Sequence, residues 1–257
     1  MDTGLEGKVA LVPGSSAGIG LAIAQGLAAE GAHVVLAGRR GELVHAEAAR
    51  LPSAIGVEVD LLDADAPGTL VAATEERFGP VDVLVLNSGG PPPGQASEVT
   101  HEQVSAAVHQ LLMQHHRLTS LVLPGMRERG WGRVIAVGSS GVQQPIERLA
   151  LSNIGRAGLA GYLKTLATEV AADGVTVNMV LPGRIDTDRV GALDQSAADR
   201  TGRTPEQVRA GAESSIPAGR YGTPEEFAAV VTFLASAAAS YVTGELIRCD
   251  GGMVRGY

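Results

Sequence analysis

Short runs of aliphatic and β-branched residues alternate along this chain with longer segments of helical spacing. Parallel strands cannot be joined by a tight hairpin, and the usual connection between them is a crossover helix. The alternation therefore predicts an α/β fold, a doubly wound and mostly parallel seven-stranded sheet with helices on both faces. The expected strands are 9–12, 33–37, 55–59, 81–86, 133–137, 175–180 and 245–249.

The alternation continues through all 257 residues without a Pro/Ser-rich linker, a repeat or a low-complexity tract. It predicts a single domain over 1–257. Residues 186–220 interrupt the rhythm because they are polar and include a short capped helix, so we expect a flap over a site there. Thr100, Thr204 and Thr223 each stand three residues before a Gln or Glu, which predicts capping boxes at three helix starts.

The charge and composition indicate a protein that binds small molecules. Twenty Lys and Arg face 28 Asp and Glu, the formal net charge is -8, and only three Phe, one Trp and four Tyr are present. This balance argues against a nucleic-acid partner or an anionic membrane surface. A single cysteine, Cys249, excludes an intrachain disulfide, and the first residues lack a signal-peptide pattern, so we expect a cytoplasmic location. No His, Cys, Asp or Glu grouping has metal-ligand spacing, and no metal is expected.

A glycine-rich turn follows the first expected strand and opens the first expected helix. Gly14 permits a tight turn, Gly18 allows the backbone to approach a pyrophosphate, and Gly20 permits close contact between helix and sheet. The helix start adds free N–H groups and the positive end of the helix dipole. At the first strand-helix junction of an alternating chain, this turn predicts a dinucleotide site; a purely structural turn is the alternative.

With this turn in place, the chain resembles the short-chain dehydrogenase/reductase family over nearly its whole length, and 3-oxoacyl-carrier-protein reductases in particular. Further marks of the family are Asp60, the run Asn87-Ser88-Gly89-Gly90, Ser139, Pro182-Gly183 and Asp250-Gly251-Gly252. The resemblance implies a Rossmann-type fold in which Asp60 faces the adenine, Asn87 and Gly89 support the cofactor cleft, and 183–187 meet the nicotinamide. The expected cofactor-binding residues are Gly14, Ser15, Ser16, Gly18, Ile19, Gly20, Arg39, Arg40, Asp60, Leu61, Asn87, Gly89, Arg156, Pro182, Gly183, Ile185 and Thr187.

The end of the second strand predicts which dinucleotide is bound. It reads Gly38-Arg39-Arg40, whereas NAD-dependent enzymes place an Asp or Glu here for the ribose 2'-hydroxyl. A nearby Arg and no carboxylate suit a 2'-phosphate, so NADP(H) is favoured over NAD(H). The alternative is an ordinary solvated arginine pair at a helix start.

The expected catalytic residues depart from the family pattern. Alignment on Ser139 and on Lys164 puts the family's Tyr position at Ser152, its Lys position at Arg156 and its Asn position at Leu111. A serine hydroxyl is a far weaker acid than a phenol whose pKa a lysine lowers, and an arginine stays protonated. We expect Ser139, Ser152 and Arg156 to be catalytic; the structural alternatives are a strand cap, a helix-start residue and an ion-pair partner.

Three functions are compatible with this pattern. The first is an NADP(H)-dependent oxidoreductase that acts on a carbonyl or alcohol substrate with an altered proton relay. The second is a catalytically silent dinucleotide-binding scaffold or sensor, and the third is a non-redox enzyme. The resemblance also implies a homotetramer, with His109, His115 and His116 expected on a surface or interface.

Overall fold

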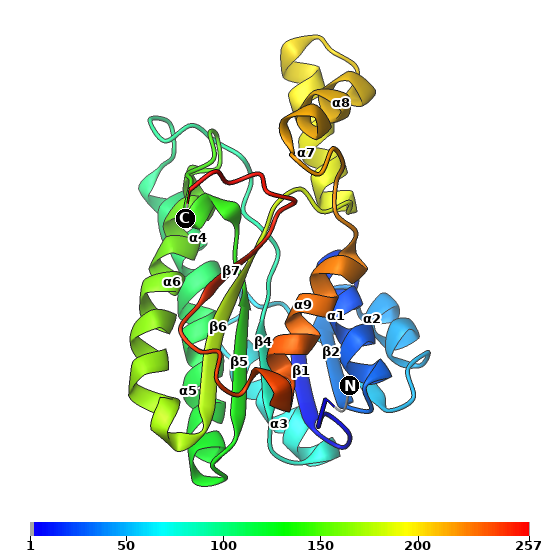
Figure 1. The fold of residues 1–257 in the computed structure, drawn as a ribbon, viewed down its shortest axis with the longest axis vertical. Helices are drawn as coiled ribbons and strands as arrows, with labels where there is room; N and C mark the ends of the chain where they lie inside the picture. Colours follow the sequence, from blue (N-terminus) through cyan, green and yellow to red (C-terminus); the bar gives the residue numbers. More distant parts are fainter. Residues whose placement is uncertain (1–2, 257) are drawn as a thin grey trace.

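The computed structural model describes residues 3–256. Its seven strands form one sheet in the order β3-β2-β1-β4-β5-β6-β7. Every neighbouring pair of strands is parallel. This confirms the Rossmann-type α/β fold (Figure 1). The strands are β1 (Val9–Pro13), β2 (His33–Gly38), β3 (Ala54–Glu58), β4 (Val83–Leu86), β5 (Gly132–Val137), β6 (Val175–Pro182) and β7 (Leu246–Cys249).

Two hydrophobic cores hold helices on the two faces of the sheet. On one face lie α1 (Gly18–Ala29), α2 (Gly41–Ala48) and α9 (Pro224–Ala235), whose Ile23, Val44 and Phe227 are fully buried. On the other lie α3 (Ala66–Phe78), α5 (Gln114–Glu128) and α6 (Ala150–Val170), whose Leu70, Leu118 and Leu159 are fully buried. β1, β4, β5 and most of β6 are buried on both faces, which explains why they read as continuous apolar runs.

The order of the strands reverses between β1 and β4. β1 pairs with β2 on one side and with β4 on the other, so the crossovers diverge at this point. In open α/β sheets, ligands bind beyond the carboxyl ends of the strands at such a switch point. The glycine-rich turn that follows β1 and the loop that follows β4 both lie there.

A wide helical turn, which the sequence did not predict, joins α4 (His101–Val108) to α5. Residues His109–Met113 form η1, a π-helical turn in which the Gln114 N–H bonds to the His109 carbonyl five residues back. Such turns insert one extra residue into an α-helix and are frequent at functional sites. The remaining short helices are η2 (Ser140–Val142), η3 (Ala171–Asp173) and η4 (Ala237–Ala239).

The segment expected as a flap forms two helices where one was predicted. They are α7 (Asp188–Thr201), capped by Thr187, and α8 (Pro205–Ser215), capped by Thr204. Figure 1 shows both standing out from the rest of the molecule, in yellow and light orange, at the end where α1 and α4 begin. The segment is therefore positioned beside the switch point.

The three predicted capping boxes are all present. The hydroxyls of Thr100, Thr204 and Thr223 each accept a hydrogen bond from the third helical N–H, and the side-chain oxygen of the Gln or Glu at that position accepts one from the threonine N–H. Each box satisfies two of the N–H groups that a helix start leaves free. Among the described residues, no helix has both the length and the apolar character that a membrane crossing requires.

Candidate functional site

The glycine-rich turn has a geometry that only glycine satisfies. Gly14 and Gly18 have φ values of 64° and 58°, in the left-handed region. A Cβ on Gly20 would overlap the Gly14 carbonyl oxygen and lie 2.7 Å from Nδ2 of Asn87, closer than real Cβ contacts. α1 therefore begins directly against the turn, and its free N–H groups face the space above it.

Asn87 attaches this turn to the end of β4. Its Nδ2 donates hydrogen bonds to the carbonyl oxygens of Pro13, at 3.0 Å, and Gly14, at 3.1 Å, and the side chain is buried. Two strands that are adjacent in the sheet are thereby held together just beyond their ends. Asn87 thus fixes the position of the glycine-rich turn relative to β4.

The two serines of the turn have different environments. Ser15 is fully buried; its hydroxyl donates to the Val12 carbonyl at 2.6 Å and accepts from the Ala37 N–H at 3.0 Å. Its side chain thus joins β1 to β2. Ser16 is partly exposed and accepts hydrogen bonds from Nε and Nη2 of Arg40, at 3.3 and 2.8 Å.

Arg39 and Arg40 directly follow the end of β2, and both are exposed. Arg40 reaches the glycine-rich turn through Ser16, whereas Arg39 lies 3.9 Å from a carboxylate oxygen of Asp60 with most of its side chain in water. Exposed ion pairs of this kind are weak, so a phosphate competes for Arg39 at little cost. The arrangement places two cations where an adenosine 2'-phosphate is expected.

Two glutamines from the wide turn and α5 fix the loops after β3 and β4. Gln114 is fully buried and donates to the carbonyls of Leu61 and Asp63, both at 2.7 Å. Gln110 donates to the Gly89 carbonyl at 2.8 Å. Sequence reasoning did not identify either glutamine as part of the site.

The loop after β6 brings the start of α7 to the glycine-rich turn. A Cβ on Gly183 would lie 2.7 Å from Cα of Asp250, which shows how closely the loops after β6 and β7 pack. Ile185 is buried and pairs with Gly222. A Cβ on Gly18 would meet the Thr187 methyl at 3.3 Å, so Thr187 lies directly beside the glycine-rich turn.

Ser139 lies just after the end of β5, and Ser152 lies in α6. Ser139 caps η2, and its Oγ accepts the Gly141 N–H at 3.0 Å. Ser152 lies in the first turn of α6 and is partly exposed, and its side-chain hydroxyl makes no hydrogen bond to another described residue. Its neighbour Asn153 donates to the Ile146 carbonyl at 3.0 Å and so holds the intervening loop.

Arg156 is buried where the end of β5 meets α6. Its side chain donates to the Val137 carbonyl, and no described carboxylate pairs with it. Burial first, and then the positive charge of Arg189, lower the pKa of Arg156 to about 10, so the side chain is protonated at neutral pH. The ion-pair alternative for Arg156 is therefore wrong among the described residues.

His115 corrects another expectation. It was expected on a surface or interface together with His109 and His116, but it is fully buried inside the subunit. Burial first, and then the charge of Arg156, lower its pKa to about 3, against a smaller opposite effect of the Leu111 backbone. His115 is therefore neutral at physiological pH and lies within electrostatic range of Arg156.

Leu111 lies on the wide turn and packs against α6. It is fully buried, and a Cβ on Gly155 would lie 2.7 Å from its Cβ. The wide turn thus contacts α6 one residue before Arg156, which brings together the residues expected at the family's Asn and Lys positions.

Arg189 was not predicted as a site residue. It lies in the first turn of α7, and its Nη2 donates to the Pro91 carbonyl in the loop after β4, at 2.6 Å. Its guanidinium packs against Gly90, where an added Cβ would lie 3.0, 3.4 and 3.5 Å from Nη2, Cζ and Nε. The segment 186–220 is thereby joined to the opposite side of the switch point.

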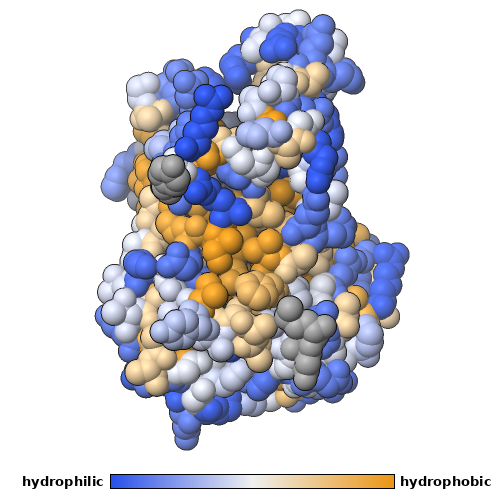
Figure 2. All heavy atoms as spheres, in the orientation of Figure 1, coloured by the Kyte–Doolittle hydropathy of each residue, from blue (hydrophilic) through white to orange (hydrophobic). Residues whose placement is uncertain are grey.

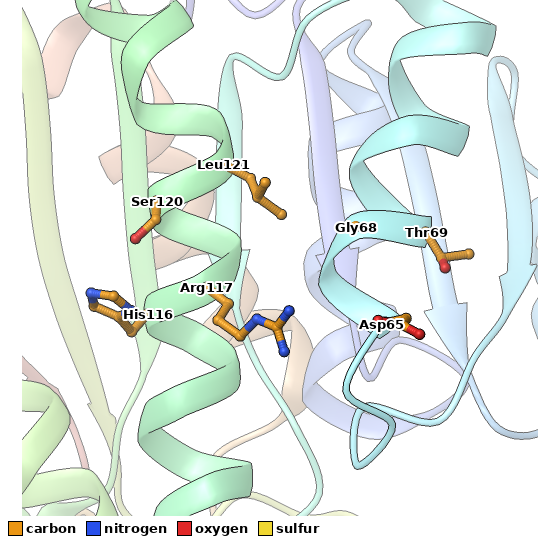
Figure 3. A pocket seen from close by; sticks show the side chains of 7 residues that line it. All are labelled: Asp65, Gly68, Thr69, His116, Arg117, Ser120 and Leu121. Carbon is orange, nitrogen blue, oxygen red and sulfur yellow. The ribbon is translucent and has the colours of Figure 1, made fainter.

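A separate surface hollow, of about 480 Å³, lies between α3 and α5 (Figure 3). Asp65 and Thr69 line it from α3 and its start, and His116, Arg117 and Leu121 line it from α5. None of the predicted site residues lines it. Within residues 3–256, no group of three or more His, Cys, Asp or Glu side chains has the arrangement of a metal site.

Comparisons with known proteins agree with this geometry. The family model described as enoyl-(acyl carrier protein) reductase matches residues 14–254. The curated 3-oxoacyl-[acyl-carrier-protein] reductase MabA of Mycobacterium tuberculosis is 39% identical over 248 residues, which cover 96% of this chain and 93% of that protein.

Two solved structures are similar along nearly the whole chain. L-sorbose reductase from Gluconobacter frateurii, complexed with NADPH and L-sorbose, has a TM-score of 0.94 at 35% identity and 100% coverage of both chains. An actinorhodin polyketide ketoreductase with NADPH has a TM-score of 0.91 at 34% identity, covering 96% of this chain and 97% of that one.

Proposed function

Because this chain belongs to the short-chain dehydrogenase/reductase family, we propose that it is an NADP(H)-dependent oxidoreductase that interconverts a carbonyl and an alcohol by an altered proton relay. The observation that carries the proposal is the packing of Gly14, Gly20 and Asn87, in which the Asn87 side chain and the Gly14 carbonyl leave no room for a Cβ on either glycine. Such a turn suits a pyrophosphate at a helix N-terminus. The proposal is supported by the NADPH present in the similar reductase structures.

The residues of this chain supply the contacts that a dinucleotide needs. The turn and Thr187 would hold the pyrophosphate and nicotinamide ends, and Ser16, Arg39 and Arg40 would hold the 2'-phosphate. When bound, NADPH supplies the hydride for carbonyl reduction. The remaining requirements are orientation of the carbonyl and delivery of one proton.

The proton relay is the altered part of the proposal. Ser139, Ser152 and water would donate hydrogen bonds that polarise the carbonyl oxygen. The alkoxide formed by hydride transfer is a strong base and would take its proton from bulk solvent through water, because the site holds no phenol to act as general acid. Arg156 would fix the end of β5 through Val137 and contribute a positive charge to the site. Leu111 leaves no side-chain amide at the position of the family's Asn.

A second candidate is a catalytically silent cofactor-binding protein. Burial of Arg156 and its hydrogen bond to Val137 favour this candidate, because the side chain at the family's Lys position is held by the protein itself. The two candidates share cofactor binding and differ in turnover.

Reduction of simple ketones and 3-oxoacyl thioesters with NADPH tests the proposal. The wild type is expected to turn over about 10²- to 10⁴-fold more slowly than a tyrosine-dependent relative, the usual contribution of a positioned general acid. The triple variant Leu111→Asn, Ser152→Tyr and Arg156→Lys is expected to be faster than the wild type.

Ser152→Ala tests whether the Ser152 hydroxyl takes part in the reaction. A wild type as fast as its relatives, with no loss in Ser152→Ala, would contradict the assignment of these positions. Tight NADPH binding with no turnover across carbonyl and alcohol panels would favour the silent protein.

A further inference from the structure

The two sides of the switch point each carry a guanidinium without a carboxylate partner. Arg156 uses one N–H for the Val137 carbonyl, and Arg189 uses one for the Pro91 carbonyl. A guanidinium has five N–H groups, so most of the donors on both side chains have no partner among the described residues. Arg156 is 8% exposed, which makes this a charge taken out of water.

The two cations lie close enough to repel each other. The charge of Arg189 is one of the two causes that lower the pKa of Arg156, and burial lowers the pKa of Arg189 itself. Arg156 is buried, whereas Arg189 is exposed and open to an anion from solvent. An opposite charge bound there would offset the repulsion on the buried guanidinium.

Two nearby arginines, Arg184 before α7 and Arg209 on α8, have carboxylate partners, whereas the exposed Arg200 and Arg203 have none among the described residues. Arg184 pairs with Asp194 at 2.7 Å, and Arg209 pairs with Asp186 at 2.8 Å and Glu213 at 2.9 Å. In a chain with net charge -8, carboxylates are plentiful. Arg156 and Arg189 have no carboxylate partner among the described residues, so an anion for the buried charge of Arg156 would have to come from outside the protein.

The anionic groups of the expected cofactor have other partners. The pyrophosphate position is at the turn before α1, and the 2'-phosphate position is beside Ser16 and Arg40. Arg156 and Arg189 lie instead at the ends of β5 and β4, on the side of Ser139 and Ser152. A planar fork of N–H donors matches the two oxygens of a carboxylate.

We propose that Arg189, together with Arg156, binds the carboxylate of the substrate, so that the carbonyl compounds reduced at this site are oxo acids. The assignment of this ligand as substrate rests on the oxidoreductase function proposed above. Binding of the carboxylate itself does not, and it is measurable without turnover.

The experiment compares acids with their neutral methyl esters. Pyruvate, acetoacetate and levulinate differ in the spacing between carbonyl and carboxylate, and each is tested beside its methyl ester with NADPH as reductant. For at least one pair, the wild type is expected to show a kcat/KM about 10- to 100-fold higher for the acid, the range for a charged hydrogen-bonded pair.

Three variants identify the residue responsible. Arg189→Gln is expected to remove most of the acid-over-ester preference through KM, and Arg189→Lys to keep part of it. Arg200→Gln, an exposed arginine in the last turn of the same helix, is the matched control and is expected to keep the preference. Calorimetric titration of the NADP⁺-bound protein with the same acids and esters gives a readout independent of turnover.

Each outcome separates this inference from the proposed function. Carboxylate binding that is lost in Arg189→Gln, without reduction of any compound, would support the anion site and contradict the oxidoreductase. Equal use or equal binding of acids and esters, or no binding of either, would overturn the anion site. Weaker NADPH binding in Arg189→Gln with an unchanged acid-to-ester ratio would overturn it too, by assigning Arg189 to the cofactor.

Discussion

The side-chain amide of Asn87 donates a hydrogen bond to the carbonyl oxygen of Gly14, at 3.1 Å, across the boundary between β4 and β1. This bond connects the glycine-rich turn to the end of the neighbouring strand. The position of the turn therefore depends on the loop that follows β4.

Gly20→Ala is expected to abolish cofactor binding and to destabilise the fold. The new Cβ would overlap the Gly14 carbonyl and Nδ2 of Asn87, and backbone cannot rotate away as a side chain can. Overpacking of this kind costs about 1 to 3 kcal/mol. Urea unfolding and NADPH fluorescence titration measure the two effects. Gly68→Ala is the control, because a Cβ at exposed Gly68 meets nothing within 4 Å; normal NADPH binding by Gly20→Ala would contradict the described turn.

Arg40→Ala and Arg39→Ala are each expected to weaken NADPH binding and to leave NADH binding nearly unchanged. Loss of one charge-assisted hydrogen bond to the 2'-phosphate costs about 1.5 to 3 kcal/mol, or roughly tenfold or more in Kd. Calorimetric titration with both dinucleotides measures the ratio. Arg50→Ala removes an exposed arginine that pairs with Glu47 beyond the other end of α2, and it is expected to change neither affinity. Equal affinity of the wild type for the two dinucleotides would contradict the NADP(H) preference.

His115 is expected to make stability fall as the pH is lowered. Its pKa in the folded protein is about 3, below the ordinary 6.5, so between these values the unfolded chain binds a proton that the folded chain does not. The stabilisation is complete above about pH 6.5 and decreases toward pH 3, by at most about 1.4 kcal/mol per pH unit. Urea midpoints between pH 4.5 and 7.5 measure this slope.

Replacement of the imidazole tests the origin of that slope. His115→Leu is expected to flatten it, whereas His101→Gln, at an exposed position in α4, is expected to leave it unchanged. An identical slope in His115→Leu and the wild type would show that other groups are responsible.

We propose that the protein is a homotetramer. The family resemblance implies one interface formed by the helices that begin near Thr100 and near Ser152, and a second formed by the final strand. Met113, Leu121 and Ile154 are 47%, 48% and 43% exposed on these helical stretches, η1, α5 and α6. Figure 2 shows an apolar area around β7 and α9, where the second interface is expected, and every residue of β7 is partly exposed. Light scattering at micromolar concentration measures the mass. Leu121→Glu and Ile154→Glu together are expected to reduce it, and a monomeric wild type would contradict the proposal.

The sequence predicted those parts of the fold that local chemistry determines. All seven strands lie within a few residues of the expected positions, because buried parallel strands are continuous aliphatic runs. The capping boxes at Thr100, Thr204 and Thr223 were predicted because a hydroxyl and a Gln or Glu three residues apart satisfy helix N–H groups wherever the helix packs.

The features that the sequence missed depend on tertiary contacts. His115 stands beside His116 in a polar run, and only the packing of α5 against the sheet and α6 decides which of them is buried. The role of Arg189 depends on a carbonyl 98 positions earlier in the chain. The structural role of Ser15 depends on the Ala37 N–H of β2, a partner that the local sequence around the turn does not reveal.

The wide turn at His109–Met113 also determines where this helical stretch tolerates a change of length. A π turn contains one residue more than an α-helical turn, and successive residues of an α-helix are about 100° apart around its axis. A chain one residue shorter within this turn closes into plain α-helix and keeps Leu118, Val122 and Met126 facing the core. The same deletion at Ser120 is expected to rotate Val122 and Met126 away from the core. Within α4–α5, the wide turn is therefore the place where one residue can be lost without turning the buried side chains of α5 out of the core.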